Sequence, residues 1–512
     1  MIGSDELLAR AFATIPALIA AHAVERPNKR VLVHDVSALT YAELDSVMDR
    51  IAAGLQRDGV MQGEIVAILA ATTLSATAAF LGTIRAGCVP ALIAPSSTQE
   101  QVDGMITDSG ARIIFVDTAS ISALPPVAAS VVYLDALDTW LPSNGVKPSP
   151  VDPAITDPFN IIYSSGTTGT PKGIVHSHAM RWAQISAYAA AGFGGAVTMV
   201  ATPLYSNTTL VSLLPTLAFG GTAVLMGKFD AARFLEVAQR ERATHAMLVP
   251  VQYQRIMAMP EFDSFDLSSF AFKTCTSAPF SAELKADVVR RWPGVMLDIY
   301  GMTEGGGTCL LYAESHPDKL HTVGRPAPGN DVRLIDEDGN EVPPGEIGEV
   351  VGRSGIMMAG YHNRQDATEA ATWVSPEGDR FIRHGDLGRF DEDGFLTLLG
   401  RSKDMIISGG FNIYPQDLES VLLQHPGVAD AAVIGIPSEA WGETPYAFYV
   451  PSSECVEASE LVTWSNARLG KTQRLSGAEP IEELPRSAIG KVLKRELRDR
   501  MHAESFTRGV TR

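Results

Sequence analysis

A short stretch rich in glycine and hydroxyl groups, YSSGTTGTPKG, runs from Tyr163 to Gly173. Glycine lets the backbone approach a ligand closely, and serine and threonine add hydroxyl donors to the backbone N–H groups. With the positive charge of Lys172 near its end, such a loop is suited to surround phosphate oxygens. Its spacing differs from that of a Walker A loop, which needs Gly, four residues and then Gly-Lys-Ser/Thr. A flexible linker is the alternative, but the strand-like segment FNIIY before the loop argues against it.

Four further stretches place charged or hydroxyl side chains beside glycines. They are YGMTEGGG at 300–307, HGDLGRF at 384–390, GRSKDMIISGGFNIYPQDLE at 400–419 and LPRSAIGKVLKREL at 484–497. Each is weak by itself, because a carboxylate before glycines is usually part of a turn and a lysine before a helix is usually solvated. Their order and spacing along one chain are much more specific. His176 and His178 indicate a metal site only weakly, since no further ligands stand at a suitable spacing.

The apolar pattern predicts the elements that must position these motifs. In the first half of the chain, short apolar strands such as EIVAILA, CVPALIA, RIIFVD, FNIIYSS, VTMVATPL and GTAVLM alternate with helices. Helices are expected up to Arg85, over 99–109 and from His178, directly after the phosphate-type loop. This alternation predicts parallel sheets covered by helices on both faces. From about Thr322, turn signals such as DEDGN and PPGE predict a β-rich subdomain, and a short α+β unit follows LLGRSKDMIISGG.

The composition narrows the class of protein. With 512 residues the chain is too long for one ordinary core, and its 46% hydrophobic and 20% charged residues indicate a soluble globular protein. The net charge of −18 argues against non-specific binding of nucleic acids. Four scattered cysteines without a C-x-x-C pair favour a reducing cytoplasm over a disulfide framework. No secretory signal is evident, and we interpret the uncharged stretches 65–84 and 182–227 as buried interior, not as transmembrane segments.

Together, the motifs resemble those of acyl- and aryl-CoA synthetases of the adenylate-forming superfamily, and most of all benzoate- and coumarate-type CoA ligases. The resemblance runs from about TYAELDSVMDRIAAGL at Thr40 to the end of the chain. It implies an α/β fold with a large N-terminal domain over 1–402, formed by two parallel-type sheets and a β-barrel-like subdomain at about 322–400. A small mobile α+β domain over 403–512 would follow, with its hinge at Lys403.

The resemblance also implies a reaction in two halves. A carboxylic acid and ATP would give an acyl-adenylate and pyrophosphate, and coenzyme A would then displace AMP. ATP, Mg²⁺ and coenzyme A are therefore the expected cofactors and co-substrates. A homodimer is one assembly to test for.

The same resemblance assigns a role to each motif. Tyr300 would stack on adenine, Thr303 would bond the α-phosphate, and Glu304 would hold Mg²⁺. Asp386 would accept both ribose hydroxyls with Arg401 near the same sugar, and Lys491 would bridge the carboxylate and the α-phosphate. Thr303, Glu304 and Lys491 are thus the expected catalytic residues. The expected contacts to ATP and AMP are Ser164, Ser165, Gly166, Thr167, Thr168, Gly169, Lys172, Ser277, Ala278, Pro279, Tyr300, Gly301, Met302, Asp386 and Arg401. The expected acyl pocket comprises Tyr205, Ser206, Asn207, Gly305 and Gly306, and the expected contacts to coenzyme A are Gly409, Gly410 and Trp441.

This chain departs from the family pattern at two places. Related ligases often have PLYH or PLFH where this chain has PLYSN, so Ser206 replaces an aromatic His that gates the acyl pocket. The stretch KTQRLSG at 471–477 lacks the usual Lys-x-Pro, which leaves Lys471 and Arg474 as candidates for contacts to the phosphates of coenzyme A.

The expected surroundings of the acid are uncharged, namely 205–209, Ser277 and 305–309. A second buried charge on the acid would need a partner there. We therefore expect an apolar monocarboxylate, either aromatic or of medium chain length. The three glycines after Glu304 suggest room for a bulky group.

Three alternatives stand beside an ATP-dependent acid–CoA ligase. An amino-acid or acyl adenylating enzyme that delivers to a carrier protein is less favoured, since the surroundings of PLYSN are neutral and only 21 residues follow Lys491. A P-loop or Rossmann enzyme is disfavoured by the loop spacing and by the lack of G-x-G-x-x-G after a strand. A non-catalytic ligand-binding relative would not need Thr303, Glu304, Asp386 and Lys491 together. Release of AMP separates these alternatives.

Overall fold

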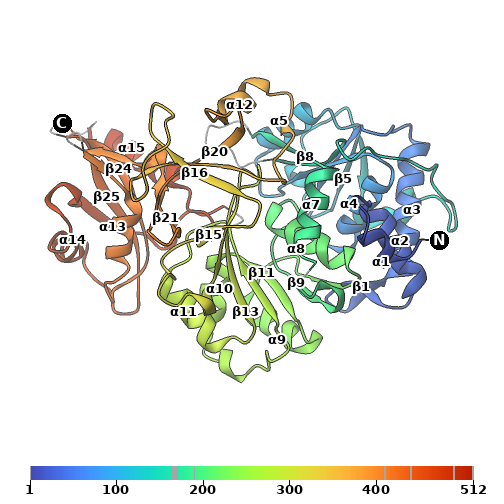
Figure 1. Cartoon of the computed structure of the whole chain (residues 1–512), viewed down its shortest axis with the longest axis horizontal. Coiled ribbons are helices and arrows are strands. Elements are labelled where there is room, and N and C mark those ends of the chain that lie inside the picture. Colours follow the sequence, from blue (N-terminus) through green and yellow to red (C-terminus); the bar gives the residue numbers. More distant parts are fainter. Residues whose placement is uncertain are drawn as a thin grey trace. The chain divides into compact units, whose positions relative to one another are not determined.

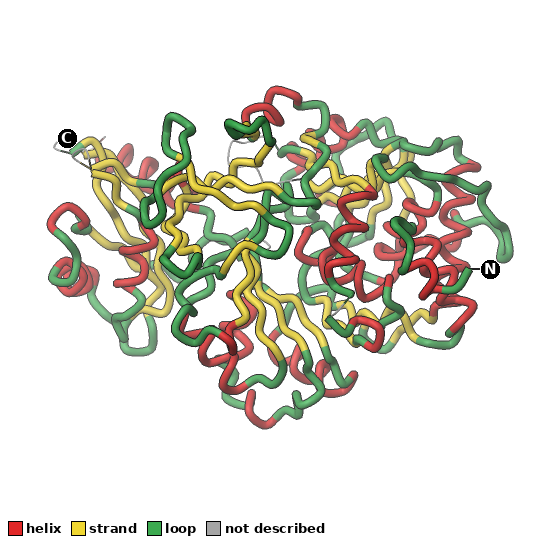
Figure 2. The backbone as a smooth tube through the Cα atoms, in the orientation of Figure 1, coloured by secondary structure: helices red, strands yellow, loops and turns green. Residues whose placement is uncertain are grey.

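The computed structural model of the chain describes residues 2–163, 171–189, 191–408, 411–438, 441–487 and 490–509 (Figure 1). The chain divides into two compact units by its internal contacts. The first unit consists of Met1–Asp331 and Gly352–Ile382, and the second of Val332–Val351 and Arg383–Arg512. Both units combine helices with sheets, as Figure 2 shows.

One sheet of the first unit has seven strands in the order β18-β8-β7-β4-β3-β5-β6. The strands from β7 to β6 run parallel, whereas β8 pairs antiparallel with β7 and β18 pairs antiparallel with β8. All residues of β4 and β5 are buried, as expected for a parallel sheet covered on both faces. Their bounds are β3 (Ile65–Leu69), β4 (Val89–Ile93), β5 (Ile113–Val116), β6 (Ser130–Tyr133), β7 (Pro158–Tyr163), β8 (Gly173–Ser177) and β18 (Gly360–Tyr361). The sequence interpretation missed β8, because GIVHS is short and directly follows a glycine-rich loop.

The second sheet of this unit has nine strands in the order β15-β14-β13-β12-β11-β9-β10-β1-β2. The strands from β13 to β1 are parallel, and the edge strands β2, β14 and β15 are antiparallel. The predicted parallel sheets are therefore present, with antiparallel edges. Their bounds are β1 (Arg30–His34), β2 (Ser37–Thr40), β9 (Val197–Val200), β10 (Thr222–Leu225), β11 (His245–Leu248), β12 (Phe272–Cys275), β13 (Val295–Tyr300), β14 (Cys309–Tyr312) and β15 (Arg325–Pro326).

Helices cover these sheets, and threonines cap the starts of two of them. Thr40 and Thr98 each form a capping box, which satisfies backbone N–H groups at the starts of α3 and α5. Nearly every residue of α8 is buried, so this part of the uncharged stretch 182–227 forms interior as predicted, whereas the segment before β9 includes exposed residues. The helices are α1 (Ser4–Leu8), α2 (Ile15–Glu25), α3 (Tyr41–Arg57), α4 (Leu74–Arg85), α5 (Gln99–Ser109), α6 (Leu137–Trp140), α7 (His178–Ala187), α8 (Asn207–Ala218), α9 (Ala231–Glu241), α10 (Pro250–Met257), α11 (Ala282–Arg291) and α12 (Gln365–Ala370).

The predicted β-rich segment forms a five-stranded sheet. Its order is β16-β17-β20-β19, and β21 also pairs with β20. The bounds are β16 (Asp331–Ile335), β17 (Gly348–Arg353), β19 (Thr372–Val374), β20 (Arg380–Phe390) and β21 (Leu396–Arg401).

The C-terminal segment is the predicted α+β structure. A second five-stranded sheet has the order β23-β22-β25-β24, with β26 parallel to β25. Its elements are β22 (Ile406–Ser408), β23 (Phe411–Ile413), α13 (Pro415–Leu422), β24 (Val428–Ser438), β25 (Gly442–Pro451), α14 (Ala458–Asn466), β26 (Gly477–Pro480) and α15 (Lys494–Gly509). Lys403 lies in a 3₁₀ turn, Ser402–Asp404, between β21 and β22. The domain boundary and hinge at Lys403 stay predictions. None of the helices in the described residues has the length and apolar character needed to cross a membrane.

Candidate active site

The YGMTE motif follows the end of β13, as predicted, and its backbone lies close to the segment after β17. Gly305 has a φ of 74°, and a Cβ atom placed there would lie 1.8 Å from the carbonyl oxygen of Ile356. A side chain at this position would therefore meet backbone on that side. The close approach of two backbone segments gives a structural reason for this glycine, and the expected room for a bulky acid beside it stays a prediction.

Tyr361 connects the carboxylate of this motif with the lysine of the phosphate-type loop. Its hydroxyl donates to Oε1 of Glu304 at 2.8 Å, and Nζ of Lys172 lies 5.1 Å from the centre of its ring. The antiparallel pairing of β18 with β8 places Tyr361 opposite Ile174 of β8. Burial and the charge of Glu304 raise the pKa of Tyr361, so it remains a proton donor at neutral pH. The sequence interpretation missed Tyr361, which is 57 residues from Glu304 in the chain.

A buried histidine forms a hydrogen bond with the backbone of the same motif. Nε2 of His176 lies 2.8 Å from the carbonyl oxygen of Thr303, and Nδ1 lies 2.7 Å from Nη2 of Arg181. The ring of His178 packs instead against Phe159, with 5.1 Å between ring centroids. The two histidines therefore serve different partners, and nothing in their arrangement supports the weak metal hypothesis. Sequence reasoning missed the role of both His176 and Arg181.

On the expected acyl side, two hydroxyl residues are joined at the start of α8. Ser277 follows β12 with a φ of 84°, which is rare for a residue with a side chain. Its Oγ lies 2.8 Å from Oγ1 of Thr208, so a strained backbone places a hydroxyl against α8. Ser206 is the N-cap of α8, and its Oγ accepts from the N–H of Thr208 at 3.3 Å. The residue that replaces the family's aromatic His thus stabilises the helix start.

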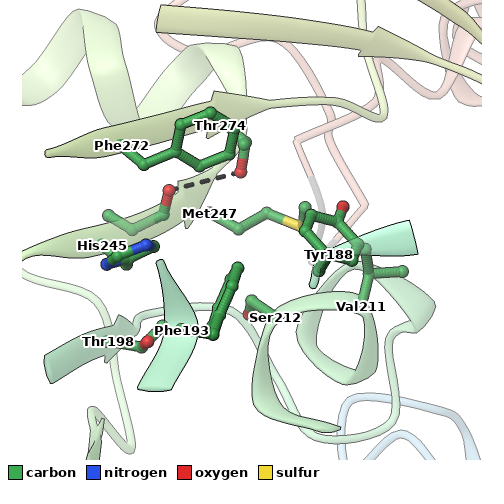
Figure 3. A pocket seen from close by; sticks show the side chains of 10 residues that line it. Tyr188, Phe193, Thr198, Val211, Ser212, His245, Met247, Phe272 and Thr274 are labelled. Carbon is green, nitrogen blue, oxygen red and sulfur yellow. Dashed lines mark hydrogen bonds between the residues drawn. The ribbon is translucent and has the colours of Figure 1, made fainter. Parts of the chain in front are cut away.

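A small cavity lies one helical turn further along α8 (Figure 3). Val211 and Ser212 stand three and four residues after Thr208 and so share its face of the helix. The volume of the cavity is about 10 Å³. Burial lowers the pKa of His245, whose Nε2 lies 2.9 Å from the carbonyl oxygen of Ala191, so this ring is neutral. The lining consists of Tyr188, Phe193, Thr198, Val211, Ser212, His245, Ala246, Met247, Phe272 and Thr274.

In the second unit, the two residues expected near the ribose lie together. Asp386 of β20 stands opposite Arg401 of β21, and Nε of Arg401 lies 3.0 Å from Oδ1 of Asp386. Nη1 of Arg401 also donates to the carbonyl oxygen of His384 at 2.8 Å. Arg401 therefore fixes the orientation of the Asp386 carboxylate. A fixed orientation suits a carboxylate that is expected to accept hydrogen bonds from two hydroxyl groups.

Lys491 is exposed on a tight turn just before α15, as predicted. The N–H of Ser487 donates to the carbonyl oxygen of Lys491 at 2.8 Å, and the N–H of Lys491 donates back to Oγ of Ser487 at 3.2 Å. Arg486 fixes the turn by donating to the carbonyl oxygen of Gly490 at 2.6 Å and by pairing with Asp430.

Ser164 to Gly169, Gly409 and Gly410 lie outside the described residues. Trp441 is 61% exposed. Their assignments to ATP and coenzyme A stay predictions.

Comparison with known proteins defines the class. Residues 19–362 match the family profile described as AMP-binding enzyme, and 417–491 match the AMP-binding enzyme C-terminal domain. The crystal structure of ATP-bound MatB from Rhodopseudomonas palustris is similar, with a TM-score of 0.85 and 28% identity over 94% of this chain and 98% of that chain. Fold and site therefore define an adenylate-forming enzyme.

Curated relatives agree with this class. Feruloyl-CoA synthase of an Amycolatopsis species is 34% identical over 489 residues, covering 93% of this chain and 96% of that protein. The fatty acid–[acyl-carrier-protein] ligase ScoC of Streptomyces coeruleorubidus is 31% identical over 503 residues, covering 94% and 96%. The chain belongs to the AMP-binding enzyme family. It is an AMP-forming acid–thiol ligase, a class that uses ATP and Mg²⁺ in the first half-reaction and coenzyme A in the second.

The residues at the site fit a magnesium ion held mainly by phosphate oxygens. Among the described residues, no group of three or more His, Cys, Asp or Glu side chains could hold a metal without further ligands. Glu304 offers a single carboxylate, oriented by Tyr361. Mg²⁺ in nucleotide sites is commonly bound by one or two carboxylates together with phosphates, which is what this arrangement can provide.

Proposed function

We propose that this ligase joins a carboxylic acid with an apolar tail and a single carboxylate to coenzyme A. The observation that carries the proposal is the cavity beside α8, which lies one turn from the Thr208–Ser277 pair. Apart from a tyrosine hydroxyl, its ionisable group is the neutral ring of His245. A second carboxylate on the acid would be buried there without a cation, which is costly. Feruloyl-CoA synthase, the relative described above, is named for an aromatic acid.

The size of the cavity bears on the length of the acid. About 10 Å³ is close to the smallest volume that can hold one water molecule. An acyl tail would therefore have to displace a lining side chain, and Met247 is unbranched and adaptable enough to move. In Figure 3 its thioether sulfur lies toward Tyr188, across the cavity. We infer that the acid is an aromatic or medium-chain one rather than a long-chain fatty acid.

In the proposed reaction, residues of both units stabilise developing charge. Lys172 attracts phosphate oxygens, the hydroxyl of Thr303 donates to the α-phosphate, and Glu304 holds Mg²⁺. Lys491 stabilises the negative charge as the carboxylate attacks. Asp386 accepts the ribose hydroxyls while Arg401 holds its carboxylate in a fixed orientation. Tyr205, Asn207 and Gly306 border the acid, and Gly409, Gly410 and Trp441 border the pantetheine arm.

The experiment is a screen of acids for release of pyrophosphate, with and without coenzyme A. We expect the best acid to be an apolar monocarboxylate and a thioester to form only when coenzyme A is present. A dicarboxylate or amino acid as the best substrate would contradict the assignment of the cavity.

Delivery to a carrier protein is the second candidate, favoured by the similarity to the acyl-carrier-protein ligase ScoC. Its test is the same assay with a phosphopantetheinylated carrier protein in place of coenzyme A. A kcat/KM for the carrier well above that for coenzyme A would select this candidate.

We also propose a cytoplasmic location, where four unpaired cysteines remain reduced. A homodimer is a prediction for light scattering to test.

A further inference from the structure

Arg181 on α7 is a fully buried cation whose hydrogen-bonding groups are all engaged. Its side chain belongs to the largest fully buried ones in the protein. Nε and Nη2 both donate to Oδ1 of Asn160 at 3.0 Å, and Nη1 donates to Oε1 of Gln184 and Oδ1 of Asn207 at 2.8 Å each. Nη2 also lies 2.7 Å from Nδ1 of His176. These five contacts use all five N–H groups of the guanidinium.

The acceptors around Arg181 are all neutral, which is unusual for a buried charge. No carboxylate of the described residues lies within ion-pair distance of it, whereas the buried Lys285 of the same unit is 2.7 Å from Asp298. A charge without a counter-ion is expensive to bury, and an apolar side chain of similar volume would fill the same space at lower cost. The arrangement even leaves Nδ2 of Asn160 buried without a hydrogen-bond partner. Packing alone therefore does not account for an arginine here.

The guanidinium determines which nitrogen of His176 carries the proton. Because Arg181 donates to Nδ1, that atom must be unprotonated, and the proton of the neutral ring is on Nε2. Nε2–H then donates to the carbonyl oxygen of Thr303 at 2.8 Å. Burial and the nearby positive charge of Arg181 lower the pKa of His176 well below its usual value, so the ring stays in this form. The direction of each hydrogen bond from Arg181 to Thr303 is thereby fixed.

The hydrogen bond to Thr303 sets one peptide group of the catalytic motif. Glu304, the next residue, is held at its carbonyl oxygen by the N–H of Met358 at 2.8 Å and at its carboxylate by Tyr361. Fixing the carbonyl of Thr303 therefore fixes the peptide plane between the two residues proposed to bind the α-phosphate and Mg²⁺.

The same guanidinium orients the acyl side. Its bond to Oδ1 of Asn207 leaves the NH₂ group of that amide turned away from the cation. Asn207 is the first residue of α8, directly after the Ser206 cap. One cation thus connects the strand before the phosphate-type loop, the strand after it, the start of α8 and the YGMTE motif.

We propose that Arg181 is a positioning residue that couples the acyl side of the site to the nucleotide side, through Asn207 on one side and through His176 and Thr303 on the other. This inference rests on the proposed function. It predicts that Arg181 controls the rate of adenylate formation and the KM for the acid without touching either substrate.

The test compares Arg181→Met, His176→Leu and His176→Gln in the pyrophosphate-release assay. We expect kcat to fall about 10- to 100-fold in Arg181→Met and His176→Leu, because a displaced catalytic group costs rate of this order. The KM for the acid should rise in Arg181→Met and change little in His176→Leu. His176→Gln keeps a donor for the Thr303 carbonyl and should recover most of the rate. Because both residues act along one chain of contacts, the double variant Arg181→Met/His176→Leu should be no slower than the slower single variant.

Lys273→Met is the matched control. Lys273 is a buried cation of the same unit that is also held by neutral groups, the carbonyl oxygens of Trp292, Pro293 and Gly294. These hydrogen bonds involve neither the YGMTE motif nor α8. We expect Lys273→Met to lower the thermal midpoint as much as Arg181→Met does but to keep the parent kcat and KM. Parent-like kinetics in Arg181→Met, or multiplied losses in the double variant, would overturn the proposal.

A second readout does not depend on turnover. In ¹⁵N-histidine-labelled protein, the signal that disappears in His176→Gln should show a protonated Nε2 and an unprotonated Nδ1, and this pattern should be lost in Arg181→Met. A parent His176 with the proton on Nδ1 would refute the inference. If the parent releases no pyrophosphate with any acid, the proposed function fails, and the histidine tautomer together with the affinity for Mg·ATP decides the positioning role.

Discussion

The bond between Tyr361 and Glu304 offers the sharpest test of the candidate site. In Tyr361→Phe the hydroxyl that donates to Oε1 of Glu304 at 2.8 Å is lost, while the ring beside Lys172 remains. A hydrogen bond to a charged group contributes about 1.5–3 kcal/mol. If Glu304 holds Mg²⁺, most of this should be lost from ion binding, which corresponds to an affinity about 10- to 100-fold weaker.

The assay is pyrophosphate release titrated with Mg²⁺ at fixed ATP. We expect the Mg²⁺ concentration for half-maximal rate to rise in Tyr361→Phe and the rate at saturating Mg²⁺ to recover most of the parent value. Tyr361→Leu removes the ring as well, so its KM for ATP should rise in addition, because Lys172 loses its aromatic neighbour. Tyr312→Phe is the control, since Tyr312 is 44% exposed on β14.

An unchanged Mg²⁺ dependence in Tyr361→Phe would refute the reasoning. Glu304 would then have a structural role, with its carboxylate serving only to anchor β18. Circular dichroism and the thermal midpoint of each variant establish that the comparison is between folded proteins.

The other predictions concern both units. Lys491→Ala should slow adenylate formation by at least about 100-fold, the loss expected for a charge-stabilising donor, yet still convert synthetic acyl-adenylate and coenzyme A to thioester. Lys403→Pro should do the reverse, releasing pyrophosphate and then stalling with bound adenylate; equal loss of both steps in the two variants would exclude a rotation about Lys403. Asp386→Ala should raise the KM for ATP and slow both half-reactions, because the ribose is held throughout, and parent-like rates at low ATP would remove Asp386 from the site. Burial lowers the pKa of His178 from 6.5 to about 4. The imidazole of the unfolded chain therefore takes up a proton at a higher pH than that of the folded protein, and the free energy of unfolding falls as the pH drops from about 6.5 to about 4. At pH 4.5 this lowers the free energy of unfolding by about 2.5 kcal/mol. In urea unfolding, the free energy of His178→Gln should therefore differ less between pH 7.5 and pH 4.5 than that of the parent, by about this amount.

Local patterns were enough to predict the fold class and the placement of most motifs. Apolar strands at regular spacing identified the parallel sheets, and the end of β13 carries the YGMTE motif where the sequence indicated. Asp386 and Arg401 were assigned to one sugar, and β20 and β21 bring them into contact. These features depend on short segments or on neighbouring strands, which a sequence reports directly.

What the sequence did not reveal depends on contacts between distant segments. Tyr361 reaches Glu304 only because a two-residue strand joins the edge of the seven-stranded sheet, and no periodicity signals so short an element. His176 and Arg181 looked like ordinary residues beside a helix start, since their importance lies in the neutral partners that surround them. Gly305 was expected beside the substrate, and no local pattern indicated that the backbone of Ile356 lies where its side chain would be. A single sequence gives the residue type and not the neighbour that requires it.

The pairing of β1 with β10 affects how the protein forms on the ribosome. Thr222 donates to the carbonyl oxygen of Arg30 across 192 residues of chain, and the strands of the seven-stranded sheet other than β18 are all encoded between these two positions. At about 5–20 residues per second, synthesis reaches β10 roughly 10–40 s after β1 has been made. During this interval β1 is paired only with β2, and its other edge has no strand to pair with because β10 has not been made. The strands β3 to β8 can pair first, and the N-terminal hairpin then waits with one unpaired strand edge, which chaperones would be expected to bind.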